Sequence, residues 1–334
     1  MTMVSLGDLA RSLMLQRHTT ASNDRLNRVT QELASGRHSD IAAANRGDLS
    51  PLAAIEGALS HINGWQVGAK SLSMQLDAMQ SALGALNGIA TSMADTLVAA
   101  GGATQPTQVA LAAHSAGEHL EAAVGLLNAR AADRSVFAGT RGDSPAMIGA
   151  DELMAALLPV VSGAETAEDV QAAVQAWFDD PAGFDTLAYR GGQPQPAIAV
   201  GPGESASPSV TATDPALKSL LAGLAMSALM DRGVLNDSPA ESSKLARLSG
   251  ESLMSTATER TMLAARVGIT QSRLTEAQTR NSAEETALGI ARAGLVSRDP
   301  YASATELEAA RTQLETLYAL TSRLSGLSLI GALR

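Results

Sequence analysis

The C-terminal stretch, residues 299–334, reads DPYASATELEAARTQLETLYALTSRLSGLSLIGALR. After the proline, apolar or small residues recur at spacings of three and four, at Leu307, Ala310, Leu314, Leu317, Thr321 and Leu324. This heptad pattern, with charged residues on the other faces, predicts an amphipathic helix. The apolar stripe continues through Leu327 and Leu329. A single helix cannot bury such a stripe. The partner helix can come from the same chain or from a neighbouring copy, and the spacing allows both.

The N-terminal part carries a similar but weaker pattern. We predict a helix over residues 3–35 that ends at Gly36, with a heptad seam at Leu15, Thr19, Ser22, Leu26, Val29 and Leu33. Two of these seam positions are polar, and a helix that takes most of its stability from a partner is marginal alone. We therefore expect order over residues 50–295 and flexible ends in the free monomer.

Longer helices are predicted between the two ends. Ser50 and Pro51 form a candidate N-cap and first-turn pair for a helix over residues 51–99, and a further helix is predicted over residues 108–134. From Ser238 the long helical pattern resumes, and Arg298-Asp299-Pro300 breaks it. Asn281 falls on a seam position of this last pattern. It either fixes the register of a coiled coil or marks a solvated kink.

Residues 141–235 differ in composition from the rest. They hold 12 acidic and 4 basic residues, so that they account for −8 of the net charge of −10, and prolines are frequent among them. Short helices are predicted near 151–161, 166–178 and 215–230. Two edge strands in a hairpin are predicted at 196–200 and 209–212. This pattern predicts a small, solvated α+β insert.

Together these patterns predict a mainly α fold. An elongated core of long helices in a coiled coil is expected from the N- and C-terminal segments, with the insert domain projecting from one end. The predicted division is residues 1–140 for the N-terminal half of the core, 141–235 for the insert and 236–334 for the C-terminal half.

Composition excludes several classes of function. A net charge of −10 disfavours nucleic-acid binding, which needs clustered Lys and Arg. The chain has no cysteine, so it has no disulfide, thiolate metal site or cysteine nucleophile. Residues 1–16 lack the basic start of a signal peptide. The most apolar later window, residues 217–230, is too short to span a bilayer. We expect a soluble protein without membrane insertion.

No chemical site can be assembled from the remaining motifs. His114 and His119 are five residues apart and do not share a helix face, as zinc ligands would. Asp179-Asp180 lacks further oxygen ligands for a hard cation, and Arg-Gly-Asp, which occurs at 46–48 and 141–143, is attributed to chance. We therefore expect no catalytic residues, no cofactor and no metal, and we do not expect an enzyme.

Several short strings resemble the flagellin family, most closely its hook-associated proteins. In the N-terminal part they are QELASGR at 31–37, GDLSPLAA at 47–54 and VFAGT at 136–140. In the C-terminal part they are ARVG at 265–268, QSRL at 271–274, DPY at 299–301 and LSL at 327–329. These strings occur in the family's order at both ends of the chain, whereas the insert shows no such match.

The resemblance implies a structural subunit of the bacterial flagellum that joins hook to filament and is needed for motility. An atypical filament flagellin is the alternative, and a cytoplasmic helical scaffold is disfavoured. Implied partners are copies of the chain, neighbouring hook-associated and flagellin subunits, the export apparatus and an export chaperone. The implied location is extracellular, after export without a cleaved signal peptide. The residues expected to carry assembly are Leu15, Leu26, Val29, Leu33, Leu307, Leu314, Leu317, Leu324, Leu327 and Leu329.

Overall fold

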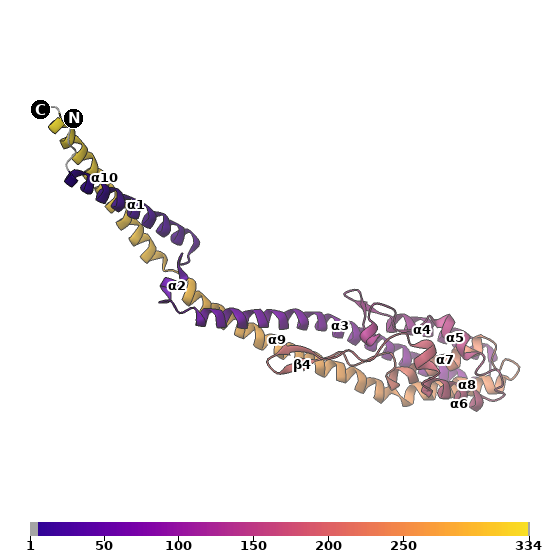
Figure 1. The fold of residues 1–334 in the computed structure, drawn as a ribbon. Helices are drawn as coiled ribbons and strands as arrows, with labels where there is room; N and C mark the ends of the chain where they lie inside the picture. Colours follow the sequence, from indigo (N-terminus) through magenta and orange to yellow (C-terminus); the bar gives the residue numbers. More distant parts are fainter. Residues whose placement is uncertain (1–5, 333–334) are drawn as a thin grey trace. The chain divides into compact units, whose positions relative to one another are not determined.

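A computed structural model describes the backbone of residues 6–332 and the side chains of residues 10–323. The fold is mainly α, as predicted (Figure 1). Its longer helices are α1 (Leu6–Ser35), α3 (Ser50–Gly101), α4 (Pro106–Leu127), α6 (Ala167–Asp179), α7 (Pro215–Asp231), α8 (Pro239–Ser255), α9 (Ala257–Val296) and α10 (Pro300–Ala332). Shorter helical elements are α2 (Ile41–Ala44), η1 (Gly139–Arg141), α5 (Ala150–Leu157) and η2 (Phe184–Ala188). None of the described helices is long and apolar enough to cross a membrane.

The chain divides into two compact units. Unit 1 comprises the residues up to His61 together with those from Ala283 onward, and unit 2 comprises Ile62–Ser282. The boundary therefore falls within α3 and within α9. The predicted boundaries after residues 140 and 235 lie elsewhere. The division of the chain into three sequence segments therefore stays a prediction.

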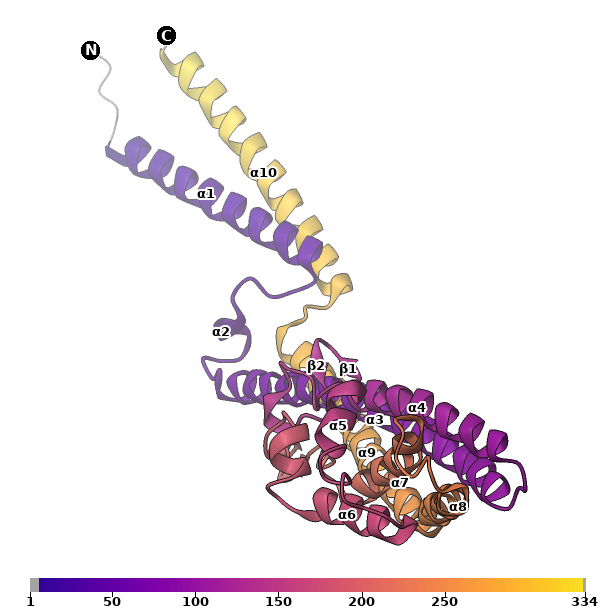
Figure 2. The ribbon, with the colours of Figure 1, turned by 90° about the vertical axis from the view of Figure 1, so that its right-hand side faces the viewer.

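In unit 1, the helices from the two ends of the chain lie side by side (Figure 2). Arg25 of α1 contacts Glu306 of α10, and Glu32 contacts Arg298 just before α10, so the two helices run antiparallel. The predicted end of the first helix is confirmed. Gly36 has φ +66°, a left-handed conformation that glycine adopts without strain, and its N–H donates to the carbonyl of Glu32 at 2.8 Å.

In unit 2, α7 lies at the centre of the packing, against α4, α6 and α8 (Figure 2). Of its 17 residues, 13 are buried, including every residue from Leu220 to Met230. A helix that is buried on all sides belongs to a core. The prediction that residues 141–235 form a solvated insert is therefore wrong for this part of the segment, because α7 supplies much of the apolar interior of unit 2.

The short helices of the acidic segment lie close to their predicted positions, but its strands differ. The two strands are β3 (Ile198–Gly201) and β4 (Glu204–Ala206), joined by a tight turn with Gly203 at φ +70°. This register pairs Ile198 with Ala206, so that Ser209–Ala212, the predicted second strand, lies beyond the hairpin. The N–H of Ala212 instead donates to the carbonyl of Phe137 at 3.1 Å.

Two predicted helix ends are also wrong. The helix expected over 108–134 ends at Leu127, and the chain forms a small hairpin of β1 (Arg130–Ala131) and β2 (Arg134–Ser135). The Asn128 side chain holds this exit by bonding both the N–H and the carbonyl of Met147. The last long helical pattern is interrupted at Thr256, which separates α8 from α9.

Close helix packing in unit 2 predicts opposite effects for two glycine substitutions. A Cβ on Gly250 would lie 2.9 Å from the carbonyl oxygen of Ala94 and 3.0 Å from the amide nitrogen of Val98. Both are backbone atoms, so relieving the contact requires the two helices to move apart. Gly250→Ala should therefore destabilise the protein by about 1–3 kcal/mol. At Gly268 nothing lies within 4 Å, so Gly268→Ala should stabilise by up to about 1 kcal/mol.

Urea unfolding followed by tryptophan fluorescence measures both effects, since Trp65 and Trp177 both belong to unit 2. Equal unfolding midpoints for the two variants would contradict the close approach of α8 to α3 at Gly250.

Candidate assembly site

The predicted seam residues of α1 and α10 mark the sides on which the two helices are least exposed. On α1, Val29 is fully buried, and Leu15, Leu26 and Leu33 are half-buried. On α10, Ala310 is buried and Leu307, Leu314 and Leu317 are half-buried. Thr321 is exposed, and the side chains of Leu324, Leu327 and Leu329 lie outside the described residues. The C-terminal stripe thus has a partner helix from its own chain over its first half.

The apolar part of this interface is thin. Among the buried side chains along the two helices, Val29 and Ala310 are apolar, whereas Ser22, Ser303 and Glu32 are polar or charged. The seam leucines of α1 and α10, which we call the leucine rows, are mostly half-exposed. They bury less apolar surface than a fully packed coiled-coil seam would. Polar contacts therefore have a larger share in holding α1 on α10.

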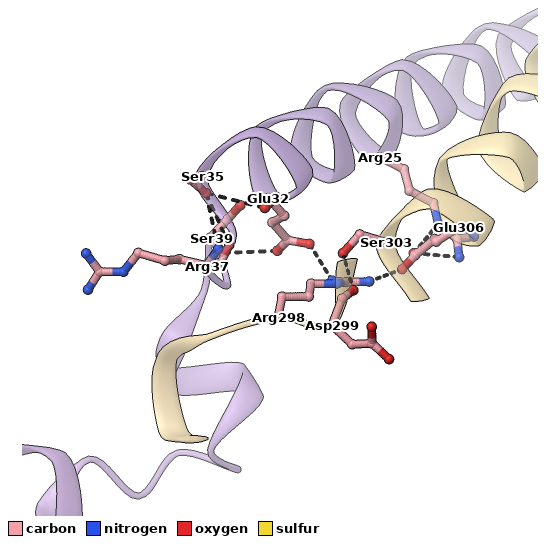
Figure 3. Close-up of polar contacts among 9 residues, drawn as sticks. All are labelled: Arg25, Glu32, Ser35, Arg37, Ser39, Arg298, Asp299, Ser303 and Glu306. Atoms are coloured by element: carbon pink, nitrogen blue, oxygen red, sulfur yellow. Dashed lines mark hydrogen bonds and ion pairs between the residues drawn. The ribbon is translucent and has the colours of Figure 1, made fainter. Parts of the chain in front are cut away.

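The polar contacts converge on Arg298, which lies between two carboxylates (Figure 3). One end of its guanidinium pairs with Glu32 of α1 and the other with Glu306 of α10. Glu306 also pairs with Arg25, at 2.8 Å. We call these four residues, Arg25, Glu32, Arg298 and Glu306, the polar clasp. The clasp joins the last three turns of α1 to the first two turns of α10.

The members of the clasp differ in exposure. The side chain of Glu32 is 4% exposed, those of Arg298 and Glu306 are 19% and 23% exposed, and that of Arg25 is 46% exposed. Glu32 additionally accepts a hydrogen bond from the N–H of Ser39 at 3.0 Å. A buried carboxylate needs such partners, because its removal from water costs several kcal/mol in their absence.

The pKa of the Glu306 carboxyl is lowered from its ordinary value. The main cause is the hydrogen bond from Arg25, and the bond from Arg298 and the positive charges of both arginines act in the same direction, against partial burial. A lowered pKa means that the ionised form is favoured in the folded protein. The Glu306 carboxylate therefore carries its negative charge throughout the neutral range.

Backbone bonds hold the chain on both sides of the clasp. Residue Arg37 forms an antiparallel bridge with Ser297, and the N–H of Arg298 donates to the carbonyl of Gly36 at 3.0 Å. The Asp299 carboxylate accepts the N–H of Tyr301 at 2.9 Å and so caps the start of α10. The end of α1 and the start of α10 are thus fixed to one another by main-chain as well as side-chain bonds.

Large apolar side chains outside the seams stay exposed on both helices. Leu13 and Met14 on α1 are 50% and 61% exposed, and Tyr318 and Leu320 on α10 are 52% and 46% exposed. A shallow groove of about 450 Å³ runs along α1, lined by Leu13, Gln16, Arg17, Thr20, Ala21 and Asp24. These exposed residues were not among the predicted assembly residues, because a heptad pattern marks only the seam.

Asn281 is neither solvated nor kinked. It is 2% exposed, and its side-chain amide donates to the carbonyl of Val200 at 2.7 Å, which attaches the β3–β4 hairpin to α9 within unit 2. His114 lies 3.5 Å from Asp231, whereas His119 bonds the carbonyl of Ser115, so the two histidines have separate surroundings. Among the described residues, no group of three or more His, Asp and Glu side chains could hold a metal ion.

Burial of Glu32 predicts a large effect for the loss of its partner. Arg298→Ala leaves a desolvated carboxylate with the single bond from Ser39, and breaking a buried pair in this way costs about 3 kcal/mol. Every 1.4 kcal/mol is tenfold in an equilibrium constant, so amide hydrogens in the last turns of α1 should exchange about 100-fold faster. Hydrogen exchange followed by mass spectrometry of peptides from α1 measures the change.

Arg292→Ala is the matched control in the same unit. Arg292 pairs with Glu56 at 3.2 Å, but both side chains are about half exposed, so its loss should cost less than about 1 kcal/mol. Adding Glu32→Gln to Arg298→Ala should recover part of the protection, since no charge is then left buried. Equal exchange rates in the Arg298 and Arg292 variants would show that the clasp does not hold α1.

Comparison with known proteins supports one relationship. Residues 252–333, which contain α9 and α10, match the family described as the bacterial flagellin C-terminal helical region. No curated protein matches the chain. Among solved structures, a candidate flagellar hook-associated protein from Vibrio parahaemolyticus is similar, with 13% identity over 70% of this chain and 94% of that chain. Its TM-score of 0.41 is too low to carry an argument about fold or function.

The family match falls on the segment in which the strings ARVG, QSRL, DPY and LSL had indicated the same relationship. The resemblance to the flagellin family is thus confirmed for residues 252–333, which are similar to the bacterial flagellin C-terminal helical region.

Proposed function

We propose that the protein is a structural subunit of the bacterial flagellum, and specifically flagellar hook-associated protein 3, which joins hook to filament. The observation that carries the proposal is the match of residues 252–333 to the flagellin C-terminal helical region. The strings at 31–37 and 136–140 extend the resemblance to the N-terminal part. The atypical filament flagellin remains the second candidate, because the double aspartate that the family carries before its proline is absent at residues 47–51.

The α1–α10 pair is the part of the molecule that suits this role. The two helices bury part of their seams against each other and keep apolar side chains exposed outside the seams, at Leu13, Met14, Tyr318 and Leu320. Such residues are candidates for burial against like helices of adjacent subunits, because exposed apolar area is released from water on association. In this proposal the partners are copies of the chain and neighbouring hook-associated or flagellin subunits.

The proposal also includes the route to the assembly site. The subunit is exported through the flagellar apparatus with an export chaperone, without a cleaved signal peptide, and acts outside the cell. It needs no cofactor and performs no catalysis, so its effect on motility comes from the mechanical attachment of the filament.

A deletion strain of the source bacterium separates the two candidates. Loss of a junction protein should leave hooks without filaments and release flagellin into the medium, whereas loss of the filament flagellin should leave no excess monomer. Electron microscopy of the hooks, together with immunoblotting of the medium, measures both results. A deletion strain that keeps normal filaments and motility would contradict both candidates.

Charges at the exposed apolar positions of α10 should block assembly without unfolding the subunit. Tyr318 and Leu320, which flank the seam on either side, are about half exposed, so Tyr318→Asp with Leu320→Asp should change the melting temperature little. If neighbours cover these positions, the carboxylates are buried on assembly at a cost of several kcal/mol. Hooks without filaments are the expected phenotype. The same change at Leu324 and Leu327 tests the seam beyond the described side chains.

Leu111→Asp is the control. Leu111 is 71% exposed on α4, in unit 2, where the proposal places no essential contact. It should leave both the melting temperature and the filaments unchanged. If the α10 variant is exported, folded and still attaches filaments, Tyr318 and Leu320 are not part of the assembly surface.

A further inference from the structure

The polar clasp differs from the other ion pairs of unit 1 in holding two helices whose apolar contact is thin. Arg298 bridges Glu32 and Glu306, and Arg25 adds a second pairing to Glu306 (Figure 3). The side chains fully buried beside it are small or polar apart from Val29. By contrast, the packing of unit 2 is apolar, with α7 surrounded by α4, α6 and α8. The two units therefore rest on different kinds of interaction.

From this contrast we propose that the clasp is an acid-released lock: protonation of Glu32 and Glu306 separates α1 from α10 while unit 2 stays folded. Loss of the two negative charges leaves Arg298 between neutral groups and removes the pairing of Arg25. The half-exposed leucine rows and the main-chain bonds at Gly36 and Arg37 then have to hold the helices without the clasp. The two outer lengths of chain become free helices, which are marginal in water.

The direction and range of the response follow from the paired carboxylates. The folded-state pKa of Glu306 lies below its unfolded value because of Arg25 and Arg298. A group of this kind contributes stability that is fully present above the unfolded pKa and is lost as the pH falls through the folded pKa. An ordinary glutamate titrates near pH 4.3. The lock should therefore be fully closed at about pH 5.5 and above, and it should weaken progressively only as the pH falls below the ordinary glutamate pKa.

Other ionisable groups among the described residues lie near the clasp but form no ion pair with it. They are Arg28 on α1, Arg37, His38 and Asp40 in the segment that follows α1, and Asp299, Tyr301 and Glu308 at the start of α10. The N–H of His38 donates to the carbonyl of Val296, which holds the backbone of this segment. A response between pH 7 and 5.5 lies above the ordinary range of glutamate carboxyls and would thus point away from the clasp.

The composition of the chain allows a direct test on the full-length protein. It has no cysteine, so Asn27→Cys on α1 and Thr305→Cys on α10, both exposed, give a pair of spin labels without background. Both tryptophans, Trp65 and Trp177, belong to unit 2, so their emission reports that unit separately. Spin-label distances and tryptophan emission are then measured at pH 7, 5.5 and 3.5.

We expect one narrow distance distribution at pH 7 and 5.5, and a broad distribution at longer distances at pH 3.5, with unchanged tryptophan emission. Glu32→Gln with Glu306→Gln, added to the labelled protein, should give the broad distribution already at pH 7. Glu308→Gln is the control, because this carboxylate is exposed and has no ion-pair partner among the described residues, and it should behave as the labelled parent.

Three results would overturn the proposal. A narrow distribution at pH 3.5, or in the double glutamine variant at pH 7, would show that apolar contacts and main-chain bonds hold α1 on α10 without the charged clasp. Broadening by pH 5.5 would assign the response to a different group. A change in tryptophan emission together with the broadening would show that the clasp is not released separately from the rest of the fold.

Discussion

Arg298 lies between two carboxylates that reach it from opposite ends of the chain, Glu32 on α1 and Glu306 on α10. The contact satisfies a carboxylate that is almost fully removed from water, and it does so at the point where α9 has ended and α10 begins. The main-chain bonds from Gly36 and Ser297 to their opposite segments lie beside it. The antiparallel course of α1 and α10 depends on this arrangement, because their apolar seams are shallow and contain polar positions such as Ser22.

Unit 2 is built on a different principle. Its interior contains many alanines and few aromatic rings, and the helices approach closely enough that glycine is needed at Gly250, where α8 meets Ala94 and Val98 of α3. The aromatic residues Trp177, Phe178 and Phe184 form one cluster at α6 and η2, with ring centroids 5.1–6.2 Å apart. Small side chains and one aromatic cluster together fill a core in which α7 is buried on all sides.

The positions of the helices could be predicted because the spacing of apolar residues and the residues that end a helix are both local features of the sequence. Gly36, Pro300 and the heptads of α1 and α10 determine the bounds of these helices, and the family strings in the C-terminal part indicated the correct relationship. The burial of α7 was not predicted. Most acidic residues of the segment 141–235 lie outside α7, but the net charge was counted for the segment as a whole, so the whole segment was expected to be solvated. The end of α4 at Leu127 depends on the hydrogen bond between Asn128 and Met147. The end of β4 at Ala206 depends on the register that the turn at Gly203 sets.

The clasp could not be predicted for a related reason. Glutamate and arginine near helix ends are common, and nothing periodic connects residues that are 266 positions apart, as Glu32 and Arg298 are. Asn281 is similar, since its partner Val200 lies in the acidic segment. Sequence patterns therefore identified which face of each terminal helix turns inward, but not which charged residues would hold the faces together.

The same separation in sequence has a consequence for the order of folding. The neighbours of α7 lie between Pro106 and Ser255, so the core of unit 2 can form from contacts that are comparatively close along the chain. Arg25 and Glu306 are 281 residues apart, and the entropy of closing so long a loop opposes their meeting in an unfolded chain. Once unit 2 has folded, the effective length of that loop is much shorter. The two ends of the chain are therefore expected to join last, on a core that has already formed.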